Sequence, residues 1–160
     1  MLDHSGARIL LADRRHLEMA ERIRARMPSV RVVLQGGSAP SVDAYEELLD
    51  AATRLTLDPE AMGERSLISI NYTSGTTARP KGVMLTHRNA YLNAVNMLLA
   101  SGLRAEDVHL HVAPMFHANG WGFVWATLAV GAANVVLPRV DPGAVFESIA
   151  QNAVTSFCAA

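Results

Sequence analysis

Residues 72–83 read YTSGTTARPKGV and lie between two apolar runs of this 160-residue chain. They gather four aliphatic hydroxyls, two glycines and one lysine within a dozen positions. Hydroxyls and backbone amides donate hydrogen bonds to phosphate oxygens, glycine lets the backbone approach closely, and lysine adds a compact positive charge. The pattern therefore indicates a loop that can cradle a polyphosphate.

This loop is not a Walker A loop. That motif requires a glycine directly before its lysine and a Ser or Thr directly after it, whereas Pro80 precedes Lys81 and Gly82 follows it. Ser, Thr and Gly are also common in turns. Composition alone therefore leaves a polar surface hairpin open as the alternative.

Short apolar runs alternate with amphipathic stretches on both sides of the loop, and this alternation predicts a layered α/β domain. Strands are expected over 7–12, 30–34, 67–72, 82–85, 108–112, 134–137 and 154–157. A first helix is expected after Asp13, which can cap it, with one face formed by Leu17, Ala20, Ile23 and Met27. A second is expected over 45–52, with a buried stripe of Tyr45, Leu48, Leu49 and Ala52. A third is expected after the capping residue Thr86, with Tyr91, Ala94, Val95 and Leu98 inward, and further helices are expected over 121–130 and 142–152. Residues 53–65 are expected to form a surface connection.

Composition excludes several classes of partner and location. A net charge of −1 with interspersed charges offers no basic face, so nucleic acid is not expected as a partner. The single cysteine, Cys158, cannot form an internal disulfide and is expected to be a small buried apolar residue in a cytoplasmic protein. No Lys, Arg, Asp or Glu lies between Asp107 and Arg139. Pro114, Gly120 and several polar residues interrupt this stretch, however, so no transmembrane span is expected.

Two motifs in order resemble those of one enzyme superfamily. YTSGTTARPKGV is similar to the signature loop of adenylate-forming enzymes, and APMFHANGWG at 113–122 resembles the motif that lines the acyl pocket of fatty-acyl and aryl-acyl CoA synthetases. The flanks at 2–7, 85–89 and 154–159 also look like this subgroup, so the resemblance covers essentially the whole chain. It implies an AMP-forming acyl-CoA synthetase, with residues 1–160 forming part of its large N-terminal domain and the C-terminal domain absent.

The resemblance implies a two-step reaction that uses ATP, Mg²⁺ and coenzyme A to activate a carboxylic acid, a fatty or aryl acid in this subgroup. Lys81 and His117 would be the catalytic residues, and Thr73 is the expected protein ligand near Mg²⁺. At Ala78 the family usually has glycine, which puts the loop geometry in question. The residues implied to hold the ATP phosphates are Thr73, Ser74, Gly75, Thr76, Thr77, Lys81 and Gly82.

The second motif supplies the implied acid site. By resemblance, His117, Asn119, Gly120 and Trp121 bind the acid, with His117 beside its carboxylate and Trp121 bordering the acyl tunnel. Ordinary packing of His117 and Trp121 on one helical face stays open as the alternative, because they are four residues apart.

Other histidines carry weaker hypotheses. His109, His111 and His117 could suggest a metal site, since His109 and His111 share one strand face. No nearby Cys, Asp or Glu completes a zinc site, so the role of His109 and His111 stays open. His87 and Arg88 follow Thr86 at an expected helix start, where they could approach an anion or form a solvated helix end.

Three interpretations compete for the chain as a whole: a fragment of a working synthetase, a non-catalytic remnant, and a small phosphate-binding module. The ribose-binding aspartate, the metal-binding glutamate and the C-terminal lysine of the family have no counterpart in residues 1–160, so the isolated chain is expected to be inactive. The sequence leaves open which acid is activated and whether the parent enzyme is a homodimer.

Overall fold

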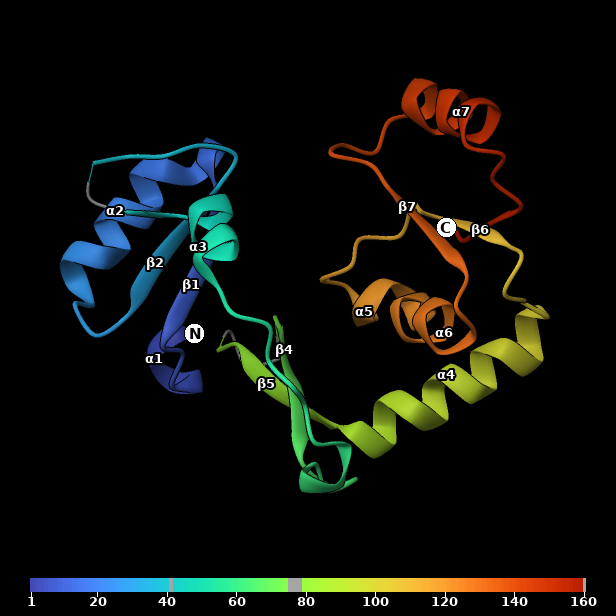
Figure 1. The fold of residues 1–160 in the computed structure, drawn as a ribbon, viewed down its shortest axis with the longest axis horizontal. Coiled ribbons are helices and arrows are strands. Elements are labelled where there is room, and N and C mark those ends of the chain that lie inside the picture. Colours follow the sequence, from blue (N-terminus) through green and yellow to red (C-terminus); the bar gives the residue numbers. More distant parts are fainter. Residues whose placement is uncertain (41, 75–78, 160) are drawn as a thin grey trace. The chain divides into compact units, whose positions relative to one another are not determined.

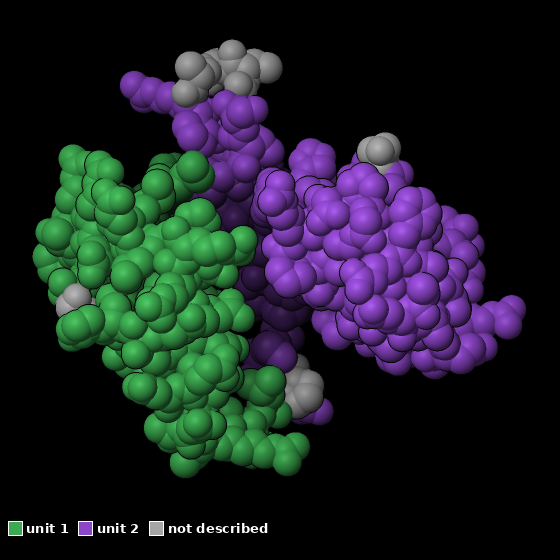
Figure 2. Space-filling view, turned by 90° about the horizontal axis from the view of Figure 1, so that it is seen from above, with its two compact units in different colours: residues 1–59 green, residues 60–160 purple. Residues whose placement is uncertain are grey.

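The computed structural model describes residues 1–40, 42–74 and 79–159, which fold into two units, Met1–Pro59 and Glu60–Ala160 (Figure 2). The loop residues Gly75, Thr76, Thr77 and Ala78 lie outside the described residues. Within the described ranges, helices and strands alternate as the sequence predicts, and the α/β class is confirmed (Figure 1).

The first unit is a three-stranded parallel sheet with helices. Its elements are α1 (Leu2–Ser5), β1 (Ile9–Asp13), the 3₁₀ turn η1 (Arg14–His16), α2 (Leu17–Arg26), β2 (Arg31–Gln35), β3 (Asp43–Ala44) and α3 (Tyr45–Ala51). Strand β2 lies between β1 and β3, and its Val32, Val33 and Leu34 are buried, as a strand covered on both faces requires.

The helix predictions in this unit are partly confirmed. Ala20 is buried on α2, as predicted from its apolar stripe. Asp13, however, caps η1 by accepting a hydrogen bond from the Arg15 amide at 2.8 Å, so a 3₁₀ turn separates it from α2. On α3 the burial prediction was wrong for Leu49, which is 51% exposed, and for Ala52, which is exposed after the helix end.

The second unit contains a β-hairpin and a second parallel sheet. The 3₁₀ turn η2 (Pro59–Ala61) begins at the last residue of the first unit. The elements that follow it are β4 (Leu67–Thr73), β5 (Lys81–Thr86), α4 (His87–Ser101), β6 (Val108–His111), α5 (Ala118–Trp121), α6 (Phe123–Val130), β7 (Ala133–Val136), α7 (Pro142–Gln151) and β8 (Ser156–Phe157). Strands β4 and β5 pair antiparallel, whereas β6 lies between β7 and β8 in parallel order. Residues 53–58 and 60–65 are exposed, as a surface connection should be.

Helix α4 connects the hairpin to the second sheet. Thr86 caps it, as the sequence predicts, and the structure shows that this cap is a reciprocal capping box with Asn89. The helix packs against α6, and Figure 1 shows the two side by side. The small residues Ala90 and Ala94 form its buried face, so the prediction that Tyr91 points inward was wrong: Tyr91 lies about 100° around the helix from Ala90 and is 68% exposed.

No helix in the described ranges is both long enough and apolar enough to cross a membrane.

Candidate functional site

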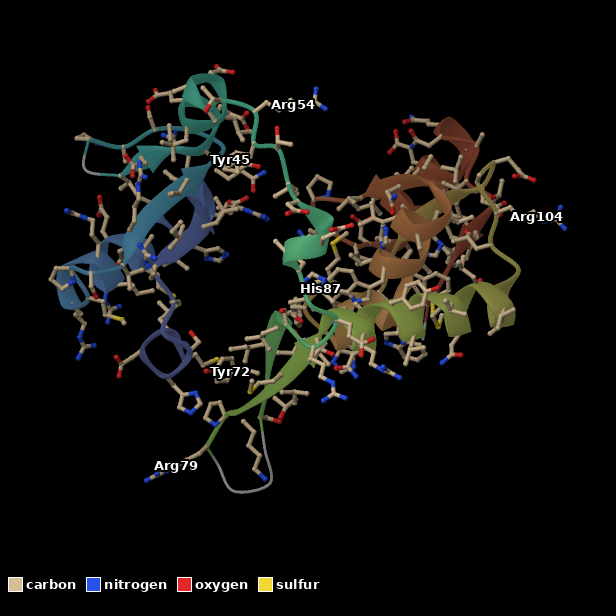
Figure 3. The ribbon with its side chains drawn as sticks, turned by 60° about the horizontal axis from the view of Figure 1, so that its bottom comes forward. Tyr45, Arg54, Tyr72, Arg79, His87 and Arg104 are labelled. Atoms are coloured by element: carbon tan, nitrogen blue, oxygen red, sulfur yellow. The ribbon has the colours of Figure 1, made fainter. Side chains whose placement is uncertain are left out.

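The β4–β5 hairpin holds the two ends of the predicted phosphate loop. In its register Thr73 pairs with Lys81 and Tyr72 pairs with Gly82. The loop therefore leaves the hairpin after Thr73 and returns at Lys81, so these two candidate residues lie directly opposite each other. Ser74 and Lys81 are exposed at this end, and Arg79 extends away from the hairpin (Figure 3).

Gly82 has a packing role in this hairpin. A Cβ atom at this position would lie 3.0 Å from Ile70 Cγ2 and 3.4 Å from Tyr72 Cζ. The tyrosine ring thus covers the glycine on one face of the hairpin. Because side chains alternate along a strand, Asn71 and Thr73 project from the opposite face.

The second motif forms a left-handed turn where a regular helix was one alternative. The backbone φ angles are 48° at Ala118, 52° at Asn119, 60° at Gly120, 59° at Trp121 and 81° at Gly122. For residues other than glycine, this conformation costs on the order of 1–2 kcal/mol each, with asparagine the best tolerated. Packing on one face of a right-handed helix therefore does not describe His117 and Trp121.

A cavity of about 640 Å³ brings the two motifs together. Its lining comes from the hairpin, from the left-handed turn and from helix α4, and α6 contributes one aromatic ring. The lining residues are Asn71, Tyr72, Thr73, Ser74, Val83, Leu85, Asn89, Ala90, Asn93, Phe116, His117, Ala118, Asn119 and Trp125. None of these residues is Asp, Glu, Lys or Arg, so the described wall of the cavity offers neutral hydrogen-bonding groups and apolar surface.

His117 also lines a second cavity. This smaller space of about 320 Å³ is bounded by Val112, Ala113, Pro114, His117, Trp121, Cys158 and Ala159. His117 therefore lies where the two cavities approach each other, and Trp121 borders the smaller one. Cys158 is half-buried and has no disulfide partner, so it is less enclosed than the sequence predicted.

The structure gives His109 and His111 structural partners. Both are buried, and their rings meet edge to face with centroids 4.9 Å apart. His109 Nδ1 lies 2.9 Å from Ser156 Oγ, and His111 Nε2 lies 2.7 Å from Asn134 Oδ1. Burial, with a smaller contribution from the neighbouring His111, lowers the pKa of His109 from 6.5 to about 4.

These two histidines lie outside both cavities that contain the candidate site residues. In residues 1–40, 42–74 and 79–159, no group of three or more His, Cys, Asp or Glu side chains is arranged to hold a metal ion.

The first residues of helix α4 already make hydrogen bonds and an ion pair within the protein. The His87 amide donates to the Ser66 carbonyl at 3.1 Å, and the Arg88 amide donates to the Glu64 carbonyl at 2.8 Å. The Arg88 guanidinium also pairs with the Glu64 carboxylate at 2.8 Å. Because these donors are occupied, the structure supports a structural helix end rather than an anion site at His87 and Arg88.

Several residues of the larger cavity were not named as site residues from the sequence, among them Asn71, Phe116 and Trp125. Asn71 could have been found from strand alternation, because it precedes Thr73 by two positions. Phe116 lies inside the quoted second motif but is 87% exposed. Trp125 reaches the cavity through the packing of α6, which no local pattern reveals.

Solved CoA ligases share this fold. The structure matches the O-succinylbenzoate coenzyme A synthetase of Bacillus subtilis, solved with ATP and magnesium ion, with a TM-score of 0.76 and 27% identity over 99% of this chain and 30% of that one. It also matches an anthranilate CoA ligase solved with anthranoyl-AMP, with a TM-score of 0.77 and 27% identity over 94% of this chain and 30% of that one. The two units therefore have the fold found within adenylate-forming CoA ligases.

The chain belongs to the AMP-binding enzyme family, whose model matches residues 1–160. A curated relative, 4-hydroxybutyrate–CoA ligase 2 of Metallosphaera sedula, is 36% identical over all of this chain. The chain spans 31% of the length of that relative.

Proposed function

We propose that this chain forms the phosphate-binding and acid-binding part of an AMP-forming acyl-CoA synthetase. The observation that carries the proposal is the single cavity lined by Thr73 and Ser74 from the phosphate loop and by His117 and Asn119 from the second motif. A reaction between ATP and a carboxylic acid requires both reactants in one place, and shared positioning supplies much of the rate enhancement.

The loop side of the cavity is assigned to ATP. The Thr73 and Ser74 hydroxyls would donate hydrogen bonds to phosphate oxygens, and Lys81, opposite Thr73, would contribute positive charge where the pyrophosphate leaves. Gly75, Thr76 and Thr77 belong to the same proposed cradle by family resemblance. Gly82 would act by keeping the hairpin compact beneath it.

Mg²⁺ fits the donors at this end of the hairpin. It keeps several waters and phosphate oxygens as ligands, so one hydroxyl, that of Thr73, is a sufficient contribution from these residues. When bound, the ion would neutralise charge on the phosphates. The described cavity wall has no carboxylate that would compete with the phosphates for it.

The other side of the cavity is assigned to the acid. We propose a fatty or aryl acid whose carboxylate accepts a hydrogen bond from His117, while its apolar portion lies against Trp125 and the aliphatic side chains of the wall. Trp121 would shape the neighbouring smaller cavity, and Gly120, which is buried, belongs to the same proposed acid site by family resemblance. The relative that acts on 4-hydroxybutyrate makes a short acid the natural starting point for a substrate series.

The proposed chemistry has two steps. A carboxylate oxygen attacks the α-phosphorus of ATP, the bond to the bridging oxygen breaks, and pyrophosphate leaves. The coenzyme A thiol, losing its proton, then attacks the acyl carbon, and AMP leaves with the carboxylate oxygen. His117 would orient the carboxylate for the first step by donating a hydrogen bond. No described residue is assigned to coenzyme A.

A hybrid enzyme tests the proposal. Residues 1–160 would replace the matching stretch of the Metallosphaera sedula ligase, and carboxylate-dependent exchange of labelled pyrophosphate into ATP would be measured with short, long and aromatic acids. Exchange that requires both ATP and an acid is expected. A folded hybrid with no acid-dependent exchange for any member of the series would refute the proposed function.

A further inference from the structure

A hydrogen bond links the phosphate hairpin to the left-handed turn. Asn71 on β4 donates from Nδ2 to Asn119 Oδ1 at 3.0 Å, across 48 positions of sequence, and the contact is partly buried. Both side chains line the 640 Å³ cavity. The link therefore joins the two motifs at the place where the proposed reactants would meet.

The turn needs support from outside itself. Ala118, Asn119 and Trp121 adopt left-handed backbone angles without being glycine. Such conformations persist only where the surrounding structure over-determines them, and they cluster at functional sites. Local hydrogen bonds from the Gly120 amide to the His117 carbonyl at 3.0 Å and from the Gly122 amide to the Asn119 carbonyl at 3.1 Å close the turn, but they do not attach it to the hairpin.

The two linked residues are placed next to the proposed reacting groups. Asn71 precedes Thr73 by two positions and projects from the same face of β4. Asn119 follows His117 by two positions, and His117 is the residue after which the left-handed angles begin. A displacement of the turn along the hairpin would therefore change the separation between the His117 ring and the loop hydroxyls.

We propose that Asn71 is a positioning residue, which holds the left-handed turn 118–122 against strand β4 and thereby fixes His117 relative to Thr73 and Ser74. The expected effect on catalysis rests on the proposed function, whereas the attachment of the turn to strand β4 does not. Loss of the link allows the turn to shift by a fraction of an ångström or more. Misplacement of a reacting group by about 1 Å can lower a rate by about 100-fold.

Kinetics of the hybrid enzyme test the catalytic consequence. Asn71→Ala is expected to lower kcat for adenylate formation by about 10- to 100-fold while changing KM for ATP by less than about 3-fold, since the phosphate cradle stays in place. Asn119→Gly removes the same hydrogen bond without adding backbone strain. The double variant should be no slower than the slower single variant, because both remove one interaction.

A matched control is Asn96→Ala, which truncates an exposed asparagine on α4 that lies outside both cavities. It should leave kcat within about 2-fold of the unmodified hybrid. A kcat for Asn71→Ala equal to that of Asn96→Ala, or additive losses in the double variant, would overturn the positioning role.

Hydrogen exchange tests the link without any need for activity. In the 160-residue chain and in the hybrid, Asn71→Ala should speed exchange of the Gly120 and Gly122 amides by about 10-fold or more, while amides of β6 are unchanged. Asn71→Asp and Asn119→Asp should each keep protection, because one amide still faces one acceptor. The double Asp variant places two carboxylates together and should lose protection.

The outcomes separate the two proposals. If the unmodified hybrid shows no acid-dependent exchange of pyrophosphate but Asn71→Ala loosens the turn amides, the proposed function fails and the link stands. If the hybrid is active and the turn amides are unaffected by Asn71→Ala, the proposed function stands and the link is refuted.

Discussion

The hairpin and the left-handed turn both line one cavity, but their conformations are specified in different ways. In the hairpin, two apolar strands pair in a register that places Thr73 opposite Lys81, so the loop ends are positioned by an ordinary antiparallel ladder. In the turn, five successive residues from Ala118 to Gly122 have positive φ angles. No strand ladder accounts for that conformation: local hydrogen bonds close the turn, and the bond from Asn71 to Asn119 attaches it to the hairpin.

The difference suggests that the hairpin and the turn have separate roles. Under the proposed function, the strand ladder would give a fixed base for the loop that is assigned to the ATP phosphates. A turn held by tertiary contacts can present a different surface when its neighbours change, which suits selection among acids. Changes in the hairpin should therefore affect all acids alike, whereas changes in the turn should discriminate among them.

The largest expected effect lies in the hairpin. In the hybrid enzyme, Lys81→Ala should slow adenylate formation by about 10- to 1000-fold, because the leaving pyrophosphate loses a nearby positive charge. The loss should be similar for short, long and aromatic acids. The measurement is acid-dependent pyrophosphate exchange, and a rate equal to that of the unmodified hybrid would remove Lys81 from the mechanism.

The next effect concerns the stability of the turn. Gly122 has φ 81°, and a Cβ there would overlap the side-chain amide of Asn93. Gly102 has φ 68° with no atom within 4 Å of the added Cβ, which makes it a control for backbone strain alone. Gly102→Ala should lower the free energy of unfolding by about 1 kcal/mol, and Gly122→Ala by about 1–2 kcal/mol, because the end of the Asn93 side chain must also move. Equal losses in urea unfolding would mean that Asn93 does not constrain the turn.

A third effect concerns the packing of strand β6 against helix α6, which follows the turn. His109 stacks on Phe123, the first residue of α6, with ring centroids 4.4 Å apart. Its pKa is lowered to about 4 from 6.5, so between these values the unfolded chain binds a proton that the folded chain excludes. Stability from this group is complete above pH 6.5 and is lost as the pH falls toward 4.

The resulting loss should be about 2 kcal/mol between pH 7.5 and pH 5. The comparison of urea unfolding for the unmodified chain and for His109→Leu isolates it, since the other five histidines are common to both proteins. If the two proteins lose the same stability on acidification, His109 does not carry this pH dependence.

The smallest expected effect is on substrate choice. Trp121 borders the smaller cavity and is 48% exposed. Trp121→Ala in the hybrid should change the ratio of kcat/KM between long and short acids by about 10-fold, with KM for ATP changed by less than about 2-fold. If the two enzymes have the same kcat/KM ratios across the series of acids, Trp121 has a packing role only. That result would also argue against separate roles for the hairpin and the turn.

Local patterns predicted most of the elements. The β4 and β5 strands begin and end within one residue of their predicted bounds, and Thr86 caps α4 as predicted. Burial was harder to predict. Tyr91 is large and apolar enough to suggest a core position, but α6 approaches the side of α4 that carries Ala90 and Ala94. Which face of a helix is covered depends on its neighbour.

The amino-acid sequence by itself determined the α/β class, the two strands that flank the loop and the family resemblance, because strand alternation, capping and the two quoted motifs are local properties of the chain. Only the tertiary structure showed that residues 118–122 are left-handed, that Asn71 bonds Asn119, and that Trp125 completes the cavity wall. Local preference opposes a left-handed turn in residues other than glycine, so its presence depends on contacts between residues far apart in sequence.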